Sequence, residues 1–95
     1  MTIRSETLAP ASEWQQATGP EVKEAMKLAG LTGEKLSEIL GVDKKGRTVR
    51  KWCGYTPEKI VAAKIAGKKP NVQPISYAAW AILAELAGFG QIWRK

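Results

Sequence analysis

Residues 31–54, LTGEKLSEILGVDKKGRTVRKWCG, predict two short helices joined by a turn. Thr32 is a good N-cap for the first helix, and Gly41 suits its end. After the polar stretch DKKG, a second helix is expected from Thr48 to about Cys53. The apolar side chains expected to face the interior are Leu36, Ile39 and Leu40 in the first helix and Val49 and Trp52, at spacing i, i+3, in the second.

Three further helices are predicted on either side of this pair. One begins at Pro20 and runs to about residue 29, because proline suits the first helical position and a glycine follows its end. Thr56 and Pro57 start another, over about 57–66, although the β-branched residues of KIVAAKI leave a short strand or hairpin arm open. The last, about 77–87, follows a basic loop. The expected fold class is all-α, a small helical bundle of four to five helices containing a helix-turn-helix.

Cysteine and histidine usage narrows the chemistry. The chain has one cysteine, Cys53, and no histidine, so it cannot form an internal disulfide or a Cys/His metal cluster. The lack of histidine also excludes Ser-His-Asp and Cys-His catalysis. We therefore expect no enzyme activity, no metal and no cofactor. No apolar run approaches the roughly 20 residues that span a bilayer, and the N-terminus lacks the apolar region of a secretory signal, so we expect a cytoplasmic protein with no membrane partner.

Positive charge is concentrated in one segment. The net charge is +6, but residues 44–69 hold nine basic side chains against one acid, Glu58, giving +8, so the rest of the chain sums to −2. Such a concentration is expected where a polyanion docks, although most charge runs are simply solvated surface. Five cations lie between Lys44 and Lys51 without an intervening acid, and their mutual repulsion favours a binding role.

Residues 31–54 resemble the helix-turn-helix of the Cro/lambda-repressor (XRE-type) family, which includes small phage and plasmid transcriptional regulators. In that family apolar residues of both motif helices and the turn glycine lock the two helices at a steep crossing. The matching positions here are Leu36, Gly41, Val49 and Trp52. Ser37 stands where the family usually has alanine, Gly33 stands where glutamine is frequent, and the turn at 43–47 is longer than usual.

The same residues predict two sets of DNA contacts. With its apolar pair facing inward, the second motif helix presents cations that fit the major groove, where arginine can grip guanine N7 and O6. The start of the first motif helix would meet phosphate through its amides and dipole. The base-reading residues expected are Arg47, Thr48, Arg50 and Lys51, and the phosphate contacts expected are Thr32, Gly33, Lys35, Lys44, Lys45, Lys68 and Lys69.

The C-terminal residues predict a homodimer, because they offer more apolar area than one side of a small core consumes. The dimer-interface residues expected are Trp80, Leu83, Leu86, Phe89, Ile92 and Trp93. The alternative is a monomer whose tail folds back over the first helix. A dimer would place two recognition helices about 34 Å apart, which predicts an inverted-repeat operator.

The domain organisation expected is a partly ordered N-terminal arm at 1–19 and a helix-turn-helix DNA-binding domain at 20–95, with the dimerisation helix and tail at about 76–95. The function expected is a sequence-specific regulator that binds double-stranded DNA as a dimer, either a repressor or an autoregulator. Two alternatives stay open: an adaptor that binds a host protein, and a non-specific architectural or packaging DNA-binding module. Residues 55–74 could form a helix, a dimer arm or a DNA-touching wing.

Overall fold

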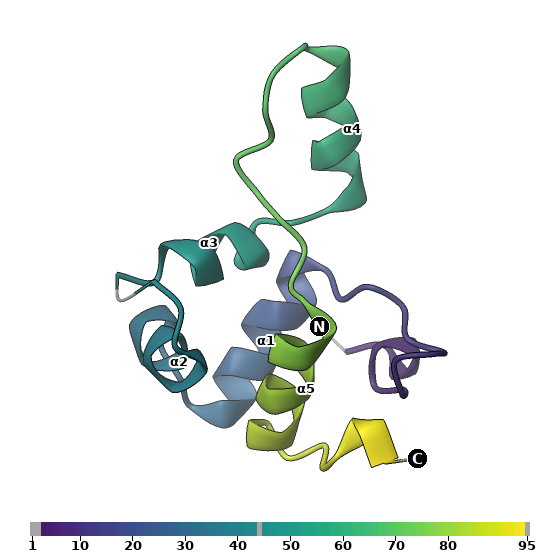
Figure 1. Cartoon of the computed structure of the whole chain (residues 1–95), viewed down its shortest axis with the longest axis vertical. Coiled ribbons are helices and arrows are strands. Elements are labelled where there is room, and N and C mark those ends of the chain that lie inside the picture. Colours follow the sequence, from purple (N-terminus) through teal and green to yellow (C-terminus); the bar gives the residue numbers. More distant parts are fainter. Residues whose placement is uncertain (1–2, 44, 95) are drawn as a thin grey trace.

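The computed structural model describes residues 3–43 and 45–94, and within them every regular element is a helix. This confirms the all-α class (Figure 1). Five α-helices and two short 3₁₀ turns follow one another along this described part of the chain. In order they are η1 (Ser5–Thr7), α1 (Gly19–Ala29), α2 (Gly33–Leu40), α3 (Arg47–Cys53), α4 (Pro57–Ile65), α5 (Tyr77–Leu86) and η2 (Ile92–Arg94).

The helix boundaries follow from the capping residues that the sequence supplies. The hydroxyl of Thr32 accepts a hydrogen bond from the backbone N of Lys35 at 3.1 Å, which satisfies an amide at the start of α2. Thr56 and Ser76 cap α4 and α5 in the same way. At its end α2 meets Gly41, whose φ of 70° lies in the left-handed region that favours glycine. The predicted starts of α2, α4 and α5 are therefore confirmed.

The core lies where α1, α2, α3 and α5 meet. α1 packs against α3 and α5, and α2 packs against α3. The largest side chains that are fully buried are those of Trp80, Leu36, Ile75, Leu83, Ile92, Val22 and Val49. The prediction was wrong at Ile39, whose side chain is 46% exposed. In the short helix α2 the buried stripe is narrow and centred on Leu36 and Ser37, so Ile39 turns to solvent.

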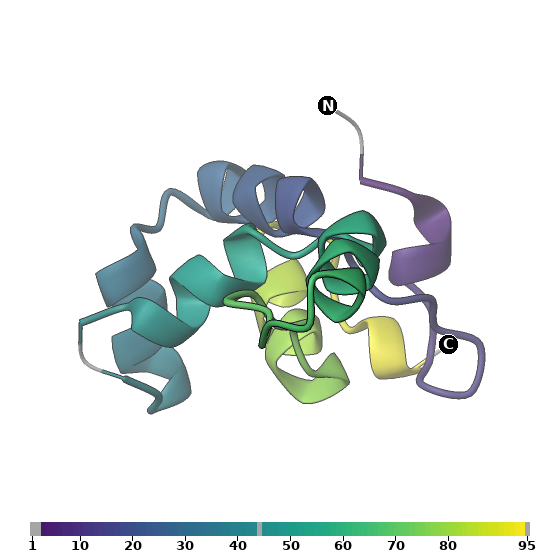
Figure 2. The same ribbon diagram turned by 90° about the horizontal axis from the view of Figure 1, so that it is seen from above.

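Residues 3–18, which the sequence presents as a partly ordered arm, are tied to the helical body. The indole Nε1 of Trp80 donates a hydrogen bond to the backbone oxygen of Thr7 at 2.6 Å. The hydroxyl of Tyr77 donates to the backbone oxygen of Ala9 at 2.9 Å, and its ring stands edge-on to Trp14 with centroids 5.2 Å apart. The segment therefore covers one side of α5. Its first part, with η1, lies on the opposite side of the molecule from α2 and α3 (Figures 1 and 2).

One helix stands away from this core. α4 projects along the longest axis of the molecule and is seen nearly end-on in Figure 2. None of its nine residues, all of which the structure describes, is buried. Residues 57–65 are helical, so the strand that the sequence left open does not form there. Within residues 3–43 and 45–94, no helix is long and apolar enough to cross a membrane.

Candidate nucleic-acid interface

The orientation of α3 decides which of its side chains can reach a ligand. Val49 is fully buried and Trp52 is 5% exposed, so both face the core as their spacing predicts. Arg47, Arg50 and Lys51 are exposed, and Thr48 is half-buried. The predicted division of α3 into an apolar inner face and a cationic outer face is therefore confirmed.

The end of α3 is fixed by close backbone packing against the start of α1. The amide of Gly19 donates a hydrogen bond to the backbone oxygen of Tyr55 at 2.7 Å. A Cβ atom at Gly19 would overlap the backbone oxygen of Cys53, so no other residue type fits without displacing one of the two helices. The sequence shows this glycine only as part of a helix-breaking Thr-Gly-Pro triplet; its packing role depends on a tertiary contact.

The turn between α2 and α3 folds back onto the start of α2. Gly46 has a φ of 75°, and a Cβ atom there would lie 3.2 Å from the backbone carbon of Gly33. The Asp43 carboxylate accepts a hydrogen bond from the backbone N of Lys45 at 2.9 Å, which tightens the turn. In Figure 1 α2 is seen nearly end-on while α3 runs across the view, so the two helices cross steeply.

This turn brings one residue expected to read bases, Arg50, to the same place as three residues expected to bind phosphate. A shallow hollow of about 370 Å³ is lined by Thr32, Gly33, Glu34, Lys45, Gly46 and Arg50. The capped start of α2, with its amides and positive dipole end, thus lies beside the cations of the turn and of α3. Glu34 and Gly46 are the two lining residues that the sequence analysis missed, and Glu34 is the one with a charged side chain. For Glu34 the sequence did carry a signal. Its position, directly after Gly33 in the first turn of a capped helix, was the available signal.

Within the described residues, the two arginines of α3 make only weak ionic and hydrogen-bonding contacts. Arg47 Nε lies 4.0 Å from the Asp43 carboxylate, and both side chains are open to solvent. The Arg50 guanidinium donates to the backbone oxygen of Lys45 at 3.2 Å. An exposed ion pair such as that of Arg47 with Asp43 contributes little to stability, and Arg47 can readily exchange it for another partner. The guanidinium groups are therefore available to a ligand.

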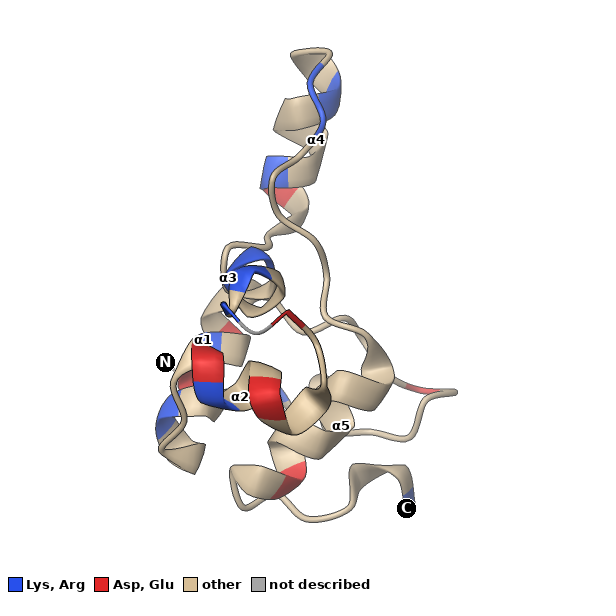
Figure 3. Cartoon of the chain, turned by 60° about the vertical axis from the view of Figure 1, so that its left-hand side comes forward, with Lys and Arg blue, Asp and Glu red and all other residues tan. Residues whose placement is uncertain are grey.

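The other cations expected to bind phosphate lie in different places. Lys35 is exposed on α2, 3.7 Å from the Glu38 carboxylate. Lys68 and Lys69 lie beyond the end of α4, so the structure does not bring them to the hollow beside α3. Lys44 lies outside the described residues. Figure 3 shows the basic segments of α3 and α4 one above the other, while most of the acidic segments lie on the body below them.

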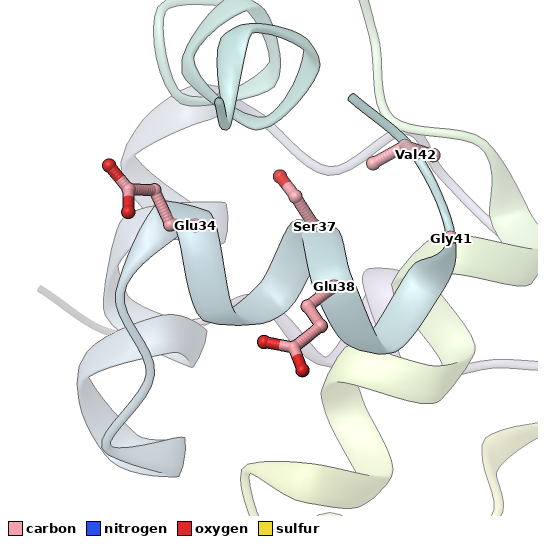
Figure 4. A pocket seen from close by; sticks show the side chains of 5 residues that line it. All are labelled: Glu34, Ser37, Glu38, Gly41 and Val42. Atoms are coloured by element: carbon pink, nitrogen blue, oxygen red, sulfur yellow. The ribbon is translucent and has the colours of Figure 1, made fainter. Parts of the chain in front are cut away.

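A second hollow, of about 500 Å³, shares Glu34 with the first and has two carboxylates in its lining. Glu34, Ser37, Glu38, Gly41 and Val42 surround it (Figure 4). The Ser37 hydroxyl donates to the backbone oxygen of Gly33 at 2.8 Å, so this serine is satisfied within its own helix. Glu38 points to the opposite side of α2 from Ser37. Two carboxylates disfavour phosphate, so this hollow is not part of the candidate DNA surface.

The dimer interface expected from the sequence needs correction. Trp80, Leu83 and Ile92 are fully buried within the single chain, so their side chains cannot contact a second copy in this conformation. They fill the core because α5 packs against α1 and η2 packs back on α5. The remaining members, Leu86, Phe89 and Trp93, are exposed.

Cys53, the last residue of α3, does not belong to the exposed cationic face of that helix. Its side chain is half-buried, with Sγ 3.7 Å from Met26 Sδ. Burial raises the pKa of the Cys53 thiol, which outweighs the opposite effect of the Lys23 charge. Over residues 3–43 and 45–94, no three His, Cys, Asp or Glu side chains are placed to hold a metal ion.

The fold and this surface define a small all-helical protein with a basic face on a short helix whose opposite face is built into the core. The chain is 46% identical over 95 residues to a transcriptional repressor protein KorC of Escherichia coli, covering 99% of this chain and 93% of the relative. It is 44% identical over 94 residues to another Escherichia coli protein of that name, covering 98% and 92%. The chain belongs to the KorC family of transcriptional repressor proteins. No protein-family model matches the sequence, and no solved structure matches it.

Proposed function

We propose that this chain is a sequence-specific transcriptional repressor that reads duplex DNA with α3. The observation that carries the proposal is the split of α3 into a buried apolar face and an exposed cationic face. The likeness to proteins named transcriptional repressors, over nearly the whole chain, supports the same function.

In this proposal α2 and α3 act as a helix-turn-helix of the Cro/lambda-repressor kind, with α3 in the major groove. Arg47, Arg50 and Lys51 then face base edges, and a bidentate arginine contact selects guanine. Thr48 is half-buried and reaches a base or a phosphate only at the edge of the contact. The lengthened turn places Lys45 beside the start of α2, so it neutralises phosphate there rather than entering the groove.

Phosphate binding in this proposal centres on the hollow between the start of α2 and the turn. The amides near Thr32 and Gly33 and the positive end of the α2 dipole favour an anion. Lys35 and Lys45 add charge around it. Glu34 shares the hollow, and a carboxylate there would accept from cytosine N4 or repel phosphate, which sharpens the choice of sequence.

Two copies of the chain bound to an inverted-repeat operator would repress transcription by excluding polymerase from the DNA. The same binding could act on the protein's own promoter. Two copies related by a two-fold axis match the symmetry of such a site.

Selection of bound sites from a random DNA pool, followed by electrophoretic shift assays, tests the function. We expect an enriched inverted repeat and a preference for it that Arg50→Ala reduces, because each bidentate base contact contributes about 1–3 kcal/mol of discrimination. Arg94→Ala is the matched control, since Arg94 is exposed in η2, far from α3 (Figure 1). Equal affinity for all duplexes, with Arg50→Ala indistinguishable from Arg94→Ala, would overturn the proposal.

A further inference from the structure

We infer that the projecting α4 arm, defined as residues 55–72, is the site at which a second copy of this chain docks, with the two α4 helices packed antiparallel. The inference rests on the proposed function in one respect, because an inverted repeat requires two copies. It names a contact surface different from the C-terminal one that the sequence predicts.

The first step is that one face of α4 has no partner within its own chain. Val61 is 55% exposed and Ile65 is 83% exposed, the largest exposure among the exposed large hydrophobic side chains of the described residues. A hollow of about 430 Å³ with a nearly all-apolar surface runs along this face, lined by Pro57, Glu58, Val61, Ala62 and Ile65. We call it the α4 apolar face.

The second step concerns the stability of the helix itself. Isolated helices shorter than about 12–15 residues are marginal in water, and helices in proteins gain most of their stability from packing an apolar face. α4 has nine residues. Ile60 and Ala63 are half-buried, but the α4 apolar face is open. A partner that covers the α4 apolar face would supply the packing that this face lacks in the single chain.

The third step is that the chemistry of this face does not suit DNA. Four of its five lining residues are apolar and the fifth is an acid, Glu58. DNA is held through cations and hydrogen-bond donors, and an acidic side chain opposes it. A protein surface of matching apolar character is the fitting occupant.

The fourth step selects a second copy, through charge complementarity along the helix. Glu58 lies in the first turn of α4, whereas Lys64 lies in its last turn and Lys68 and Lys69 follow directly. No ion pair of Glu58 occurs within residues 3–43 and 45–94. An antiparallel pair places Glu58 of each helix beside the basic end of the other, although Lys59 stands next to Glu58, and aligns the two helix dipoles favourably. The α4 arm is therefore self-complementary.

The fifth step links this contact to DNA reading. At the base of the arm, the backbone N of Gln73 donates to the backbone oxygen of Lys51 at 3.2 Å. A Cβ atom at Gly54 would lie 2.9 Å from Val72 Cγ1, so the end of the arm packs closely against the residue that precedes its start. The arm is thus attached directly to α3, and pairing of two arms fixes two α3 helices relative to each other.

Sedimentation velocity of the full chain without DNA tests the inference. We expect the unchanged protein to form a dimer and Ile65→Glu to raise the dissociation constant about 100-fold or more, since two apolar side chains lose their burial in a symmetric contact. Glu58→Lys, at the charged edge, is expected to raise it by a smaller factor. The matched control is Leu86→Glu, on the exposed C-terminal surface, which should leave the dimer intact. Circular dichroism checks that each variant stays helical.

Three outcomes would overturn the inference: a monomer at all concentrations, a dimer insensitive to Ile65→Glu, or a dimer that only Leu86→Glu dissociates. If removing the charges of Lys64, Lys68 and Lys69 lowers DNA affinity while Ile65→Glu leaves the dimer unchanged, the arm is a DNA-binding wing instead. Because the sedimentation test contains no DNA, these results are independent of whether Arg50→Ala alters sequence preference.

Discussion

The Arg4 guanidinium holds the Glu21 carboxylate through two hydrogen bonds, of 3.1 Å from Nε and 3.0 Å from Nη2. Glu21 is 3% exposed, and its oxygens also accept from the backbone N of Arg4 and from the backbone and hydroxyl of Thr18. These contacts attach residues 3–18 to the start of α1. Because Gly19 at that start packs against the end of α3, the pair supports the position of α3.

Glu21→Gln should lower the free energy of unfolding at neutral pH by roughly 2 kcal/mol, because a charged acceptor of several hydrogen bonds is lost and Arg4 is partly exposed. Burial alone would raise the pKa of Glu21, but the hydrogen bonds from Arg4 and Thr18 outweigh it and hold the pKa below its ordinary value.

A carboxyl whose pKa is depressed in the folded state contributes stability above its unfolded pKa and loses it as the pH falls through the folded value. The difference between wild type and Glu21→Gln should therefore shrink below about pH 4, near the ordinary carboxyl pKa of about 4.3. Urea denaturation at pH 7 and pH 3 measures it, with Glu13→Gln on the exposed surface as control. A pH-independent difference would contradict this account.

Trp80→Phe should cost about 1–2 kcal/mol of unfolding free energy. The substitution keeps a large ring in the core but removes the Nε1 donor and leaves the Thr7 oxygen without that hydrogen bond. Trp93→Phe is the matched control, because Trp93 is 42% exposed, and should stay within about 0.5 kcal/mol of wild type. Equal stability of the two variants would show that the Trp80 indole nitrogen contributes nothing.

Local signals in the sequence were sufficient for most of the fold. Thr32, Thr56 and Ser76 are short side chains that satisfy backbone amides three residues further along the chain, so their effect needs no tertiary context. Val49 and Trp52 face inward because their spacing and the charges around them allow one orientation of α3.

What could not be predicted depends on contacts between distant segments. Trp80, Leu83 and Ile92 look like surplus apolar area until α5 is seen packed against α1, covered by Thr7 of the N-terminal segment and followed by a tail that folds back. Conversely, α4 has the pattern of an ordinary capped helix, and nothing in its composition reveals that it projects into solvent. Local side chains determine where each helix forms. Which apolar face becomes buried depends on how the helices pack against one another in the folded chain.

Gly46→Ala should destabilise the fold by about 2 kcal/mol and weaken DNA binding. Part of the cost arises because alanine disfavours a φ of 75°, at about 1 kcal/mol, and part arises because Cβ would press on the start of α2. Gly67→Ala is the matched control: its φ is 68°, but nothing lies within 4 Å of the added Cβ atom. Thermal unfolding and shift assays on both variants separate the two contributions. If Gly46→Ala and Gly67→Ala lose the same free energy of unfolding, the close contact of the new Cβ atom with Gly33 adds no cost of its own.

Salt dependence separates a phosphate contact from a base contact within the proposed surface. The logarithm of the binding constant falls with the logarithm of salt concentration by about 0.9 per neutralised phosphate. Lys45→Ala should therefore make the slope shallower by about 0.9 and weaken all duplexes alike, because Lys45 lies beside the start of α2. Arg50→Ala should instead reduce the preference for the selected operator over other duplexes. Titrations at several salt concentrations, on the operator and a scrambled duplex, measure both. An unchanged slope for Lys45→Ala would place the phosphate elsewhere, and it would leave the hollow between α2 and the turn without a function.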